Sequence, residues 1–343
     1  MSLSLAAAPG ALAVTLHVDA SIKSPGDGLT WATGMNDLQA ALTAAAIPGS
    51  GVTEIRVAQG TYLPTVRTIA TDPRSVTFRL VGSVALRGGY AGISHADPDE
   101  YLPSTYVTAL TGDIAGDDAT NGGPGNDNSY HVLLADAGPA GELHFISGLT
   151  ITGGNANMSG NTLECRGGGL CVDDSSYISL TDCVIANNRA TLGGGLYKNW
   201  GYTSIQNSKI LSNRATTYGA GMLQEGGNLV VNACEIAHNV AEAGGGGGVD
   251  TDGNYTIENS TFMHNYAGGG GGGVRNLSSY ATGTLTNCLF SHNVAVSGGA
   301  ANVGSVVITR CTFEDNTVAY AGGAVIITNS DSSGSSTIAR SLF

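Results

Sequence analysis

Residues 257–265 read Ile-Glu-Asn-Ser-Thr-Phe-Met-His-Asn, and this arrangement recurs along the second half of the chain. An apolar residue is followed three positions later by Cys or Ser, then two later by Ile or Phe, then three later by Asn. Self-similarity at a period of about 25 residues predicts a solenoid, in which each repeat forms one coil stacked on the preceding one. The Asn residues of this column are Asn188, Asn213, Asn239, Asn265, Asn293 and Asn316.

The aligned repeats share further columns that indicate how each coil is built. Side chains two positions apart in a strand face the same side, so we expect two columns to face the interior. A pair of Gly or Ala follows each Asn and supplies tight corners. Helical spacing of apolar residues is absent, so the repeat predicts an all-β fold, a parallel β-helix with three short strands per coil. The two inward columns are Ile185, Ile210, Ile236, Phe262, Phe290 and Phe313, and Cys183, Ser208, Cys234, Ser260, Cys288 and Cys311.

We interpret the Asn column as structural. Stacked Asn side chains in neighbouring coils can hydrogen-bond to each other and to the backbone of the turns. Asn also occurs just before the Cys/Ser position, at Asn207, Asn259 and Asn287, and it tolerates the positive φ of a tight corner.

Three regions follow from this pattern. Residues 1–13 resemble a remnant of a secretory signal, with an apolar run before Ala11-Leu12-Ala13. Residues 14–150 are expected to form an N-terminal cap and the first, irregular coils, and an amphipathic helix over 36–46, capped by Asn36 or Thr33, is expected to cover the solenoid end. Residues 151–343 are expected to form regular coils, of which the last is cut off after residues 338–343. Either the chain is a fragment or another chain covers the open edge, so end-to-end self-association is one hypothesis.

Charge and composition exclude some partners. The chain has 343 residues and 14 Lys and Arg against 27 acidic residues, a formal charge of −13. Without a basic stripe, nucleic acid and anionic membrane surfaces are poor partners. No segment approaches the length needed to insert into a membrane. The signal-like start indicates an extracellular or cell-surface location.

The six cysteines divide into two groups. The four in the inward column are expected to be buried free thiols that act as small apolar groups. Cys165 and Cys171 flank a Gly triplet outside that column, and we expect them to be the best candidates for a disulfide.

Several phrases carry a resemblance to a known family. Residues 17–42 read HVDASIKSPGDGLTWATGMNDLQAAL, followed further along by EIRVAQGTYLPT, ALRGGYAG, LTGDIAGDD, NSYHVL and GLTITGGNA. These phrases resemble secreted bacterial proteins of the pectin-lyase-like superfamily, whose fold is a right-handed parallel β-helix. The later Gly-Gly and Phe-x-x-Asn phrases resemble the repeats of polymorphic outer-membrane proteins, adhesin-like autotransporter passengers. The resemblance implies the fold but not one activity, because the superfamily holds lyases, hydrolases, epimerases and non-catalytic surface proteins.

Two groups of acidic residues are candidate sites. Polar residues after the glycine column could form one stripe across successive coils. Carboxylates on alternate coils would then lie about 10 Å apart, which is near the upper limit for the carboxyl pair of an inverting glycosidase. The weak catalytic candidates are Asp173, Asp174, Glu225, Asp250 and Asp252. The second group could bind calcium through carboxylate oxygens. The alternative, which we favour, is that these are turn-forming Asp and Gly residues of an exposed insertion. The acidic residues of this group are Asp113, Asp117, Asp118 and Asp127.

A column of imidazoles is a further metal candidate. His238, His264 and His292 each precede a column Asn, and Asp315 follows in the next repeat. Imidazole binds zinc, copper and nickel, but the spacing of neighbouring coils is long for one ion.

The leading hypothesis is a secreted or surface-displayed β-helix with a structural or adhesive role, which binds an extracellular glycan or a surface protein along its side. The first alternative is a polysaccharide lyase or glycoside hydrolase that uses the acidic stripe. The second is a self-assembling fibre module. No cofactor other than the candidate calcium ion is implied.

Overall fold

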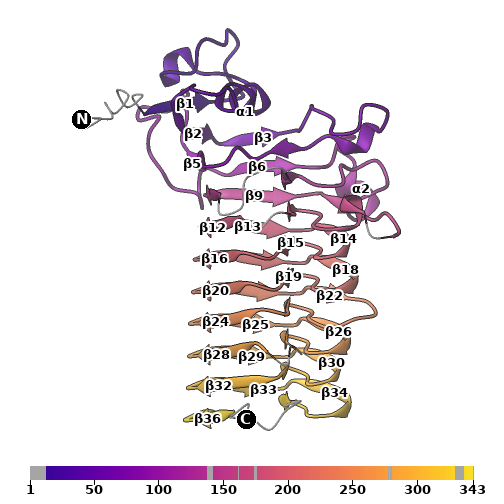
Figure 1. Ribbon diagram of the computed structural model, residues 1–343. Coiled ribbons are helices and arrows are strands. Elements are labelled where there is room, and N and C mark those ends of the chain that lie inside the picture. Colours follow the sequence, from indigo (N-terminus) through magenta and orange to yellow (C-terminus); the bar gives the residue numbers. More distant parts are fainter. Residues whose placement is uncertain are drawn as a thin grey trace, which may run out of the picture.

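The protein is a single stack of β-strand coils, seen in a computed structural model that describes residues 13–136, 142–160, 162–173, 176–276, 278, 280–328 and 336–342. In these residues the strands form four sheets that run the length of the stack, and neighbouring named strands pair in parallel (Figure 1). We number the sheets 1 to 4 in the order in which the chain passes through them. The predicted β-helix is confirmed, but each regular coil contributes four short strands where three were predicted.

Sheets 1 and 2 contain the first two strands of each regular coil. Sheet 1 contains β1 (Val14–Val18), β2 (Val52–Ala58), β5 (Ala85–Tyr90), β8 (Leu143–Ser147), β12 (Tyr177–Thr181), β16 (Tyr202–Gln206), β20 (Asn228–Asn232), β24 (Asn254–Glu258), β28 (Thr282–Thr286), β32 (Ser305–Thr309) and β36 (Thr337–Ala339). Sheet 2 contains β3 (Gly60–Tyr62), β6 (Thr108–Thr111), β9 (Leu149–Thr152), β13 (Val184–Ala186), β17 (Lys209–Leu211), β21 (Glu235–Ala237), β25 (Thr261–Met263), β29 (Leu289–Ser291) and β33 (Thr312–Glu314).

The remaining strands complete each coil. Sheet 3 contains β10 (Asn155–Ala156), β14 (Arg189–Leu192), β18 (Arg214–Tyr218), β22 (Val240–Ala241), β26 (Tyr266–Gly270), β30 (Val294–Ser297) and β34 (Thr317–Ala321). Sheet 4 contains β4 (Phe78–Arg79), β7 (Leu133–Ala135), β11 (Leu170–Val172), β15 (Leu196–Asn199), β19 (Met222–Glu225), β23 (Val249–Thr251), β27 (Val274–Asn276), β31 (Ala301–Val303) and β35 (Val325–Ile327).

The inward columns form the core of the stack. The Ile/Phe positions of successive repeats pair in register, so large apolar side chains lie directly above one another, Ile in the earlier coils and Phe in the later ones. The rings of Phe262 and Phe290 are stacked with centroids 4.8 Å apart, and Phe290 stacks on Phe313 at 5.0 Å. Burying one such side chain contributes about 2–3 kcal/mol, which is repeated in every coil.

The corners depend on residues that accept a left-handed backbone. Between sheets 1 and 2 this residue is Asn207, Asn259 or Asn287 in three coils, with φ between 48° and 53°, as the Asn pattern indicated. In other coils the same conformation is taken by Asp182, Ala233 or Arg310. Between sheets 3 and 4 a glycine such as Gly193 takes that conformation, with φ 63°. The next glycines allow close stacking: a Cβ on Gly195 would lie 2.6 Å from the carbonyl oxygen of Gly221 in the following coil.

A helix covers the N-terminal end of the stack (Figure 1). Helix α1 (Leu38–Ala45) packs Leu38, Leu42 and Ala45 into the main core, as predicted from its apolar stripe. Its N-cap is Asp37, whose carboxylate accepts the backbone N–H of Gln39 at 2.8 Å, and not Asn36 or Thr33. Thr33 instead ends the 3₁₀ helix η1 (Trp31–Thr33). The other helices are η2 (Pro73–Ser75), α2 (Asp118–Asn121) and η3 (Leu163–Cys165).

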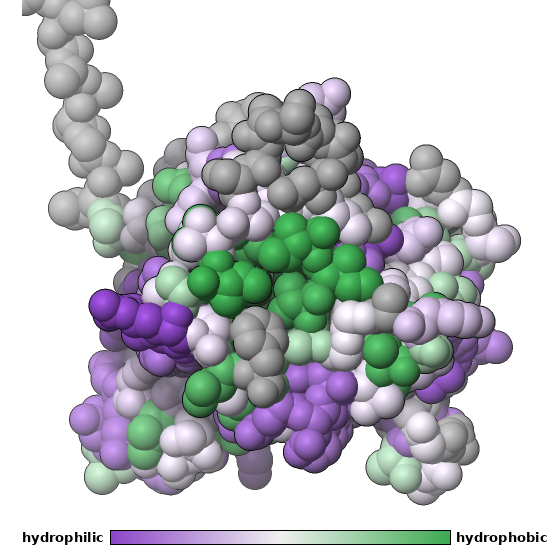
Figure 2. Space-filling model, turned by 90° about the horizontal axis from the view of Figure 1, so that it is seen from below, coloured by the Kyte–Doolittle hydropathy of each residue, from purple (hydrophilic) through white to green (hydrophobic). Residues whose placement is uncertain are grey.

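Figure 2 looks onto the opposite end and shows apolar side chains gathered at the centre of that face. The core of the final coils includes Ile308 and Phe313, with the partly buried Val325 and Ile327 packed against it. The described helices include none that is long and apolar enough to span a membrane. Residues 1–12, most of the signal-like segment, lie outside the described residues.

The predicted Cys165–Cys171 disulfide is wrong, because both are free thiols. Cys171 lies on the outer face of sheet 4 in a small apolar cluster with Leu134 and Tyr197. Cys165 lies in η3 and its Sγ donates to the carbonyl of Thr162. Burial raises the pKa of the Cys171 thiol well above its usual value. Because the thiolate is the reactive form, the buried thiol is less reactive than an exposed one.

Candidate functional site

The Asn column forms a continuous ladder at the corner between sheets 2 and 3. Nδ2 of Asn213 donates to the carbonyl of Ile185 at 2.9 Å, and its Oδ1 accepts both the backbone N–H and Nδ2 of Asn188 at 3.1 Å. The same set repeats at Asn239, Asn265, Asn293 and Asn316. These amides are turned inward and serve the backbone, so the ladder has a structural role and offers few atoms to a ligand.

The predicted acidic stripe divides into two columns on the outer side of sheet 4. Asp173 lies beside Asn199, which is in register with Glu225, and Asp252 follows in the next coil. Asp250 belongs to a neighbouring column, in register with Leu223. Asp174 lies outside the described residues.

Three of the described carboxylates are already occupied by neighbouring side chains. Asp173 forms an ion pair with Arg166 at 2.9 Å. Glu225 accepts the hydroxyl of Tyr197 at 2.8 Å. A carboxylate that holds such a partner is less able to act as a free acid or base.

Asp250 forms the most buried of these pairs. Nε of Arg275 donates to both carboxylate oxygens at 3.0 Å, and its guanidinium lies over the ring of Tyr218. Burial raises the pKa of Asp250 to about 7, although Arg275 acts in the opposite direction. The geometry is that of a structural ion pair under a covering aromatic ring. Asp252, in contrast, is exposed.

Lys198 from the same polar segment is fully buried and shares its face of sheet 4 with Val172. Its Nζ donates to the carbonyl of Asn199 at 3.3 Å. The side chain therefore lies on the core side and is not part of the outer stripe.

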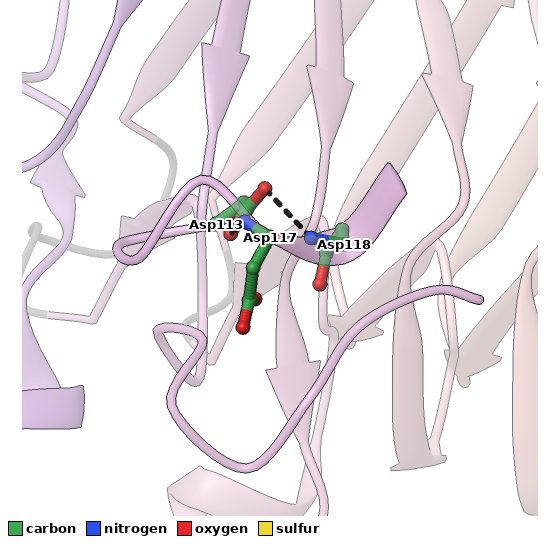
Figure 3. A group of neighbouring side chains, drawn as sticks. All are labelled: Asp113, Asp117 and Asp118. Atoms are coloured by element: carbon green, nitrogen blue, oxygen red, sulfur yellow. Dashed lines mark hydrogen bonds between the residues drawn. The ribbon is translucent and has the colours of Figure 1, made fainter. Parts of the chain in front are cut away.

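Three of the four predicted calcium ligands come together. One ligand atom from each of Asp113, Asp117 and Asp118 lies within 4.8 Å of the others, while Asp127 is exposed and not part of this group. In Figure 3 an oxygen of Asp113 faces the backbone N–H of Asp118, and the Asp117 and Asp118 side chains point to the other side. Asp113 also accepts the N–H groups of Gly116 and Asp117.

Asp118 is likewise used within its own loop. Its carboxylate accepts the N–H of Gly125 at 3.3 Å and Nδ2 of Asn128 at 2.9 Å. Burial raises the pKa of Asp118. Both Asp113 and Asp118 therefore shape the loop that contains them, which is the turn-forming alternative considered from the sequence.

This loop overhangs a groove that the sequence did not predict. The groove has a volume of about 740 Å³ and lies between residues 118–125 and the corner of sheets 2 and 3. We call it the corner groove. The coil side of the groove is lined by Thr152, Asn187, Asn188, Arg189, Ser212, Asn213, Arg214, His238 and Val240.

Two arginines give the corner groove its chemistry. Arg189 and Arg214 are in register on β14 and β18, so their side chains lie one above the other. Both share one carboxylate, Glu242, which lies 3.9 Å from Nη2 of Arg189 and in closer contact with Arg214. Among the described residues, Nε of Arg189 is buried and has no hydrogen-bond partner. Two guanidinium groups against one carboxylate leave a net positive charge at this wall.

A signal for these arginines was present in the sequence. Each directly follows a ladder Asn, so the repeat alone would place them in one column. The opposite wall could not be found in this way, because residues 118–125 lie in a non-repeating insertion far along the chain from Arg214.

The stacked parallel coils with an internal amide ladder define a β-helix solenoid. The sequence profile described as a right-handed beta helix region matches residues 147–318, half of the chain, and the chain belongs to this family. No curated protein matches the sequence. Among solved structures, the crystal structure of pectate lyase Pel9A is similar, with a TM-score of 0.48 and 13% identity over 93% of this chain and 78% of that chain.

Proposed function

We propose that this protein is an extracellular or cell-surface β-helix that binds a polysaccharide along its side, in the corner groove. The observation that carries the proposal is the register pair Arg189 and Arg214, which faces the overhanging loop across a groove of about 740 Å³. Such an open, polar groove suits a flexible chain of sugars better than a small apolar ligand.

The charge of the arginine wall favours a glycan whose acid groups face this side of the groove, away from Asp118 on the opposite wall. A guanidinium group binds a carboxylate or sulfate through parallel hydrogen bonds, and the side chains of Arg189 and Arg214 are 43% and 55% exposed where they line the groove. The remaining corner residues Asn187, Ser212 and His238 can hydrogen-bond to sugar hydroxyls. Because the whole chain carries a charge of −13, the attraction is local to the groove.

Binding to polygalacturonate, with a neutral galactan for comparison, tests this proposal by titration calorimetry. We expect the substitution Arg189→Gln to weaken binding of the acidic glycan about tenfold or more, the loss of about one charge-assisted contact. Lys209→Gln is the matched control, since Lys209 is a neighbouring exposed cation in an ion pair with Glu235 that does not line the groove. Equal binding by wild type, Arg189→Gln and Arg214→Gln, or no binding of either glycan, would contradict the proposal.

A polysaccharide lyase or glycoside hydrolase stays the second candidate. We place it behind binding because Asp173, Glu225 and Asp250 are held by Arg166, Tyr197 and Arg275. A lyase forms unsaturated products that absorb in the ultraviolet, and a hydrolase forms new reducing ends. Either signal, if abolished by a substitution in the corner groove, would make the protein an enzyme and correct the present proposal.

A further inference from the structure

The histidine column forms an exposed stack at the corner between sheets 2 and 3. His238, His264 and His292 all have the left-handed backbone of this corner, with φ between 53° and 59°. Their ring centroids are 5.0 Å apart in both pairs, nearly parallel for the first pair and tilted by 41° for the second. The tilt means that the lower end of the stack, at His292, differs from the upper end.

His292 is oriented by its neighbours. Its Nδ1 shares a hydrogen bond of 2.6 Å with Oγ of Ser291. When Nδ1 carries the proton and donates to this hydroxyl, Nε2 has the free lone pair. A second hydrogen-bonding partner of this kind commonly fixes the tautomer of a histidine that binds a metal.

Asp315 lies opposite the free nitrogen. Nε2 of His292 and Oδ2 of Asp315 are 3.7 Å apart, too far for a hydrogen bond. Two ligands at about 2.0–2.1 Å from a tetrahedral zinc ion lie roughly 3.4 Å from each other. The observed separation is therefore close to what an ion between them requires, and it needs only a small side-chain movement.

We propose that His264, His292 and Asp315 bind a divalent transition-metal ion of the zinc class, with water as the fourth ligand. His264 is the third ligand, since its exposed ring lies next to that of His292. The ligand atoms of the three residues do not all lie within 4.8 Å of one another in the described structure, so the His264 side chain must leave the stack to reach the ion. Two imidazoles and one carboxylate form a donor set typical of zinc. The site lies below the corner groove and does not depend on the proposed glycan binding.

Zinc titration of the full chain, freed of any histidine tag, tests the site with a chromogenic chelator as competitor. We expect one zinc ion per chain, and at least a tenfold weaker affinity in His292→Ala and in Asp315→Asn. Both residues are exposed on their side chains, at 50% and 75%, so the variants should fold normally. Copper(II) bound at the same site should show imidazole nitrogen coupling in its electron paramagnetic resonance spectrum.

His238→Ala is the matched control, since it removes a stacked imidazole that is not one of the three ligands. We expect it to keep the zinc affinity within about twofold. Absence of zinc binding by the wild type would overturn the proposal. So would an affinity that is unchanged in both His292→Ala and Asp315→Asn, or one that falls most in His238→Ala.

Discussion

At the scale of single residues, the buried pair of Asp250 and Arg275 couples the stability of the fold to pH. The pKa of Asp250 in the folded chain is about 7, above the 3.8 of an exposed Asp. A carboxyl with a raised pKa contributes stability that is complete below about pH 4 and is lost as the pH rises through 7. Losing the proton is unfavourable because the carboxylate is removed from water.

We therefore expect the free energy of unfolding to fall by about 2 kcal/mol between pH 5 and pH 8 through this group. Chemical denaturation across this range, compared with the variant Asp250→Asn, measures the effect. The amide cannot ionise, so the variant should show a flatter dependence. A wild type and an Asp250→Asn variant with the same slope would show that Arg275 keeps the carboxylate charged throughout.

Some residues of the candidate sites could be recognised from the sequence and others could not. The ladder Asn residues were identifiable because their period is regular and Asn suits stacked amides. The ion pair of Asp250 was not, because its partner Arg275 lies in the next coil and only the register of the two strands joins them. The corner groove was missed for a similar reason, since one of its walls is not part of the repeat.

At the scale of elements, helix α1 was predictable in type and place. Its apolar stripe and its role as a cover follow from the spacing of Leu38, Leu42 and Ala45. The number of strands per coil was harder to predict. Sheets 3 and 4 are separated by a short glycine-rich corner, such as Gly193–Gly195, whose first residue is left-handed, and the inward residues of sheet 3 are small, as at Ala190 and Ala215. Small residues carry little of the apolar alternation that indicates a strand.

The helix should matter for stability in proportion to the apolar area it covers. We expect Leu42→Ala to lower the free energy of unfolding by about 2–4 kcal/mol, because Leu42 is buried in the main core and its truncation leaves a cavity. Ala40→Ser, on the exposed side of the same helix, should change it by less than about 0.5 kcal/mol. Urea denaturation gives both values. A cost for Leu42→Ala as small as for Ala40→Ser would mean that α1 does not cover the core in solution.

At the scale of the whole molecule, each coil contacts mainly its neighbours, so stability behaves as a sum of coil and interface contributions. Asn239→Ala removes ladder bonds in the middle of the stack and leaves the N–H of Asn213 and the carbonyl of Ile210 without partners. We expect a loss of about 2–4 kcal/mol and a broader transition, because the two halves become less strongly coupled.

Asn316→Ala, at the other end of the ladder, should cost less, since its surroundings are partly exposed. Asn228→Ala serves as a control for the loss of a surface amide, which makes one contact to Asn254 at 3.3 Å. Calorimetry measures this coupling. The measured enthalpy of unfolding equals the enthalpy calculated from the shape of the transition only when the whole stack unfolds as one unit. A sharp, single transition in Asn239→Ala, with the same midpoint as in Asn228→Ala, would contradict a coupling role for the ladder.

The ladder also has a direction. Each amide donates to a carbonyl of the preceding coil and accepts N–H groups from it, as Asn213 does with Ile185 and Asn188. A coil that emerges later during synthesis thus finds its partners already in place on the coil made before it. Assembly from the N-terminus, starting at the covered end, lets every amide be satisfied as it arrives. The fold is in this sense suited to a chain that is made, or passed through a narrow opening, one coil at a time.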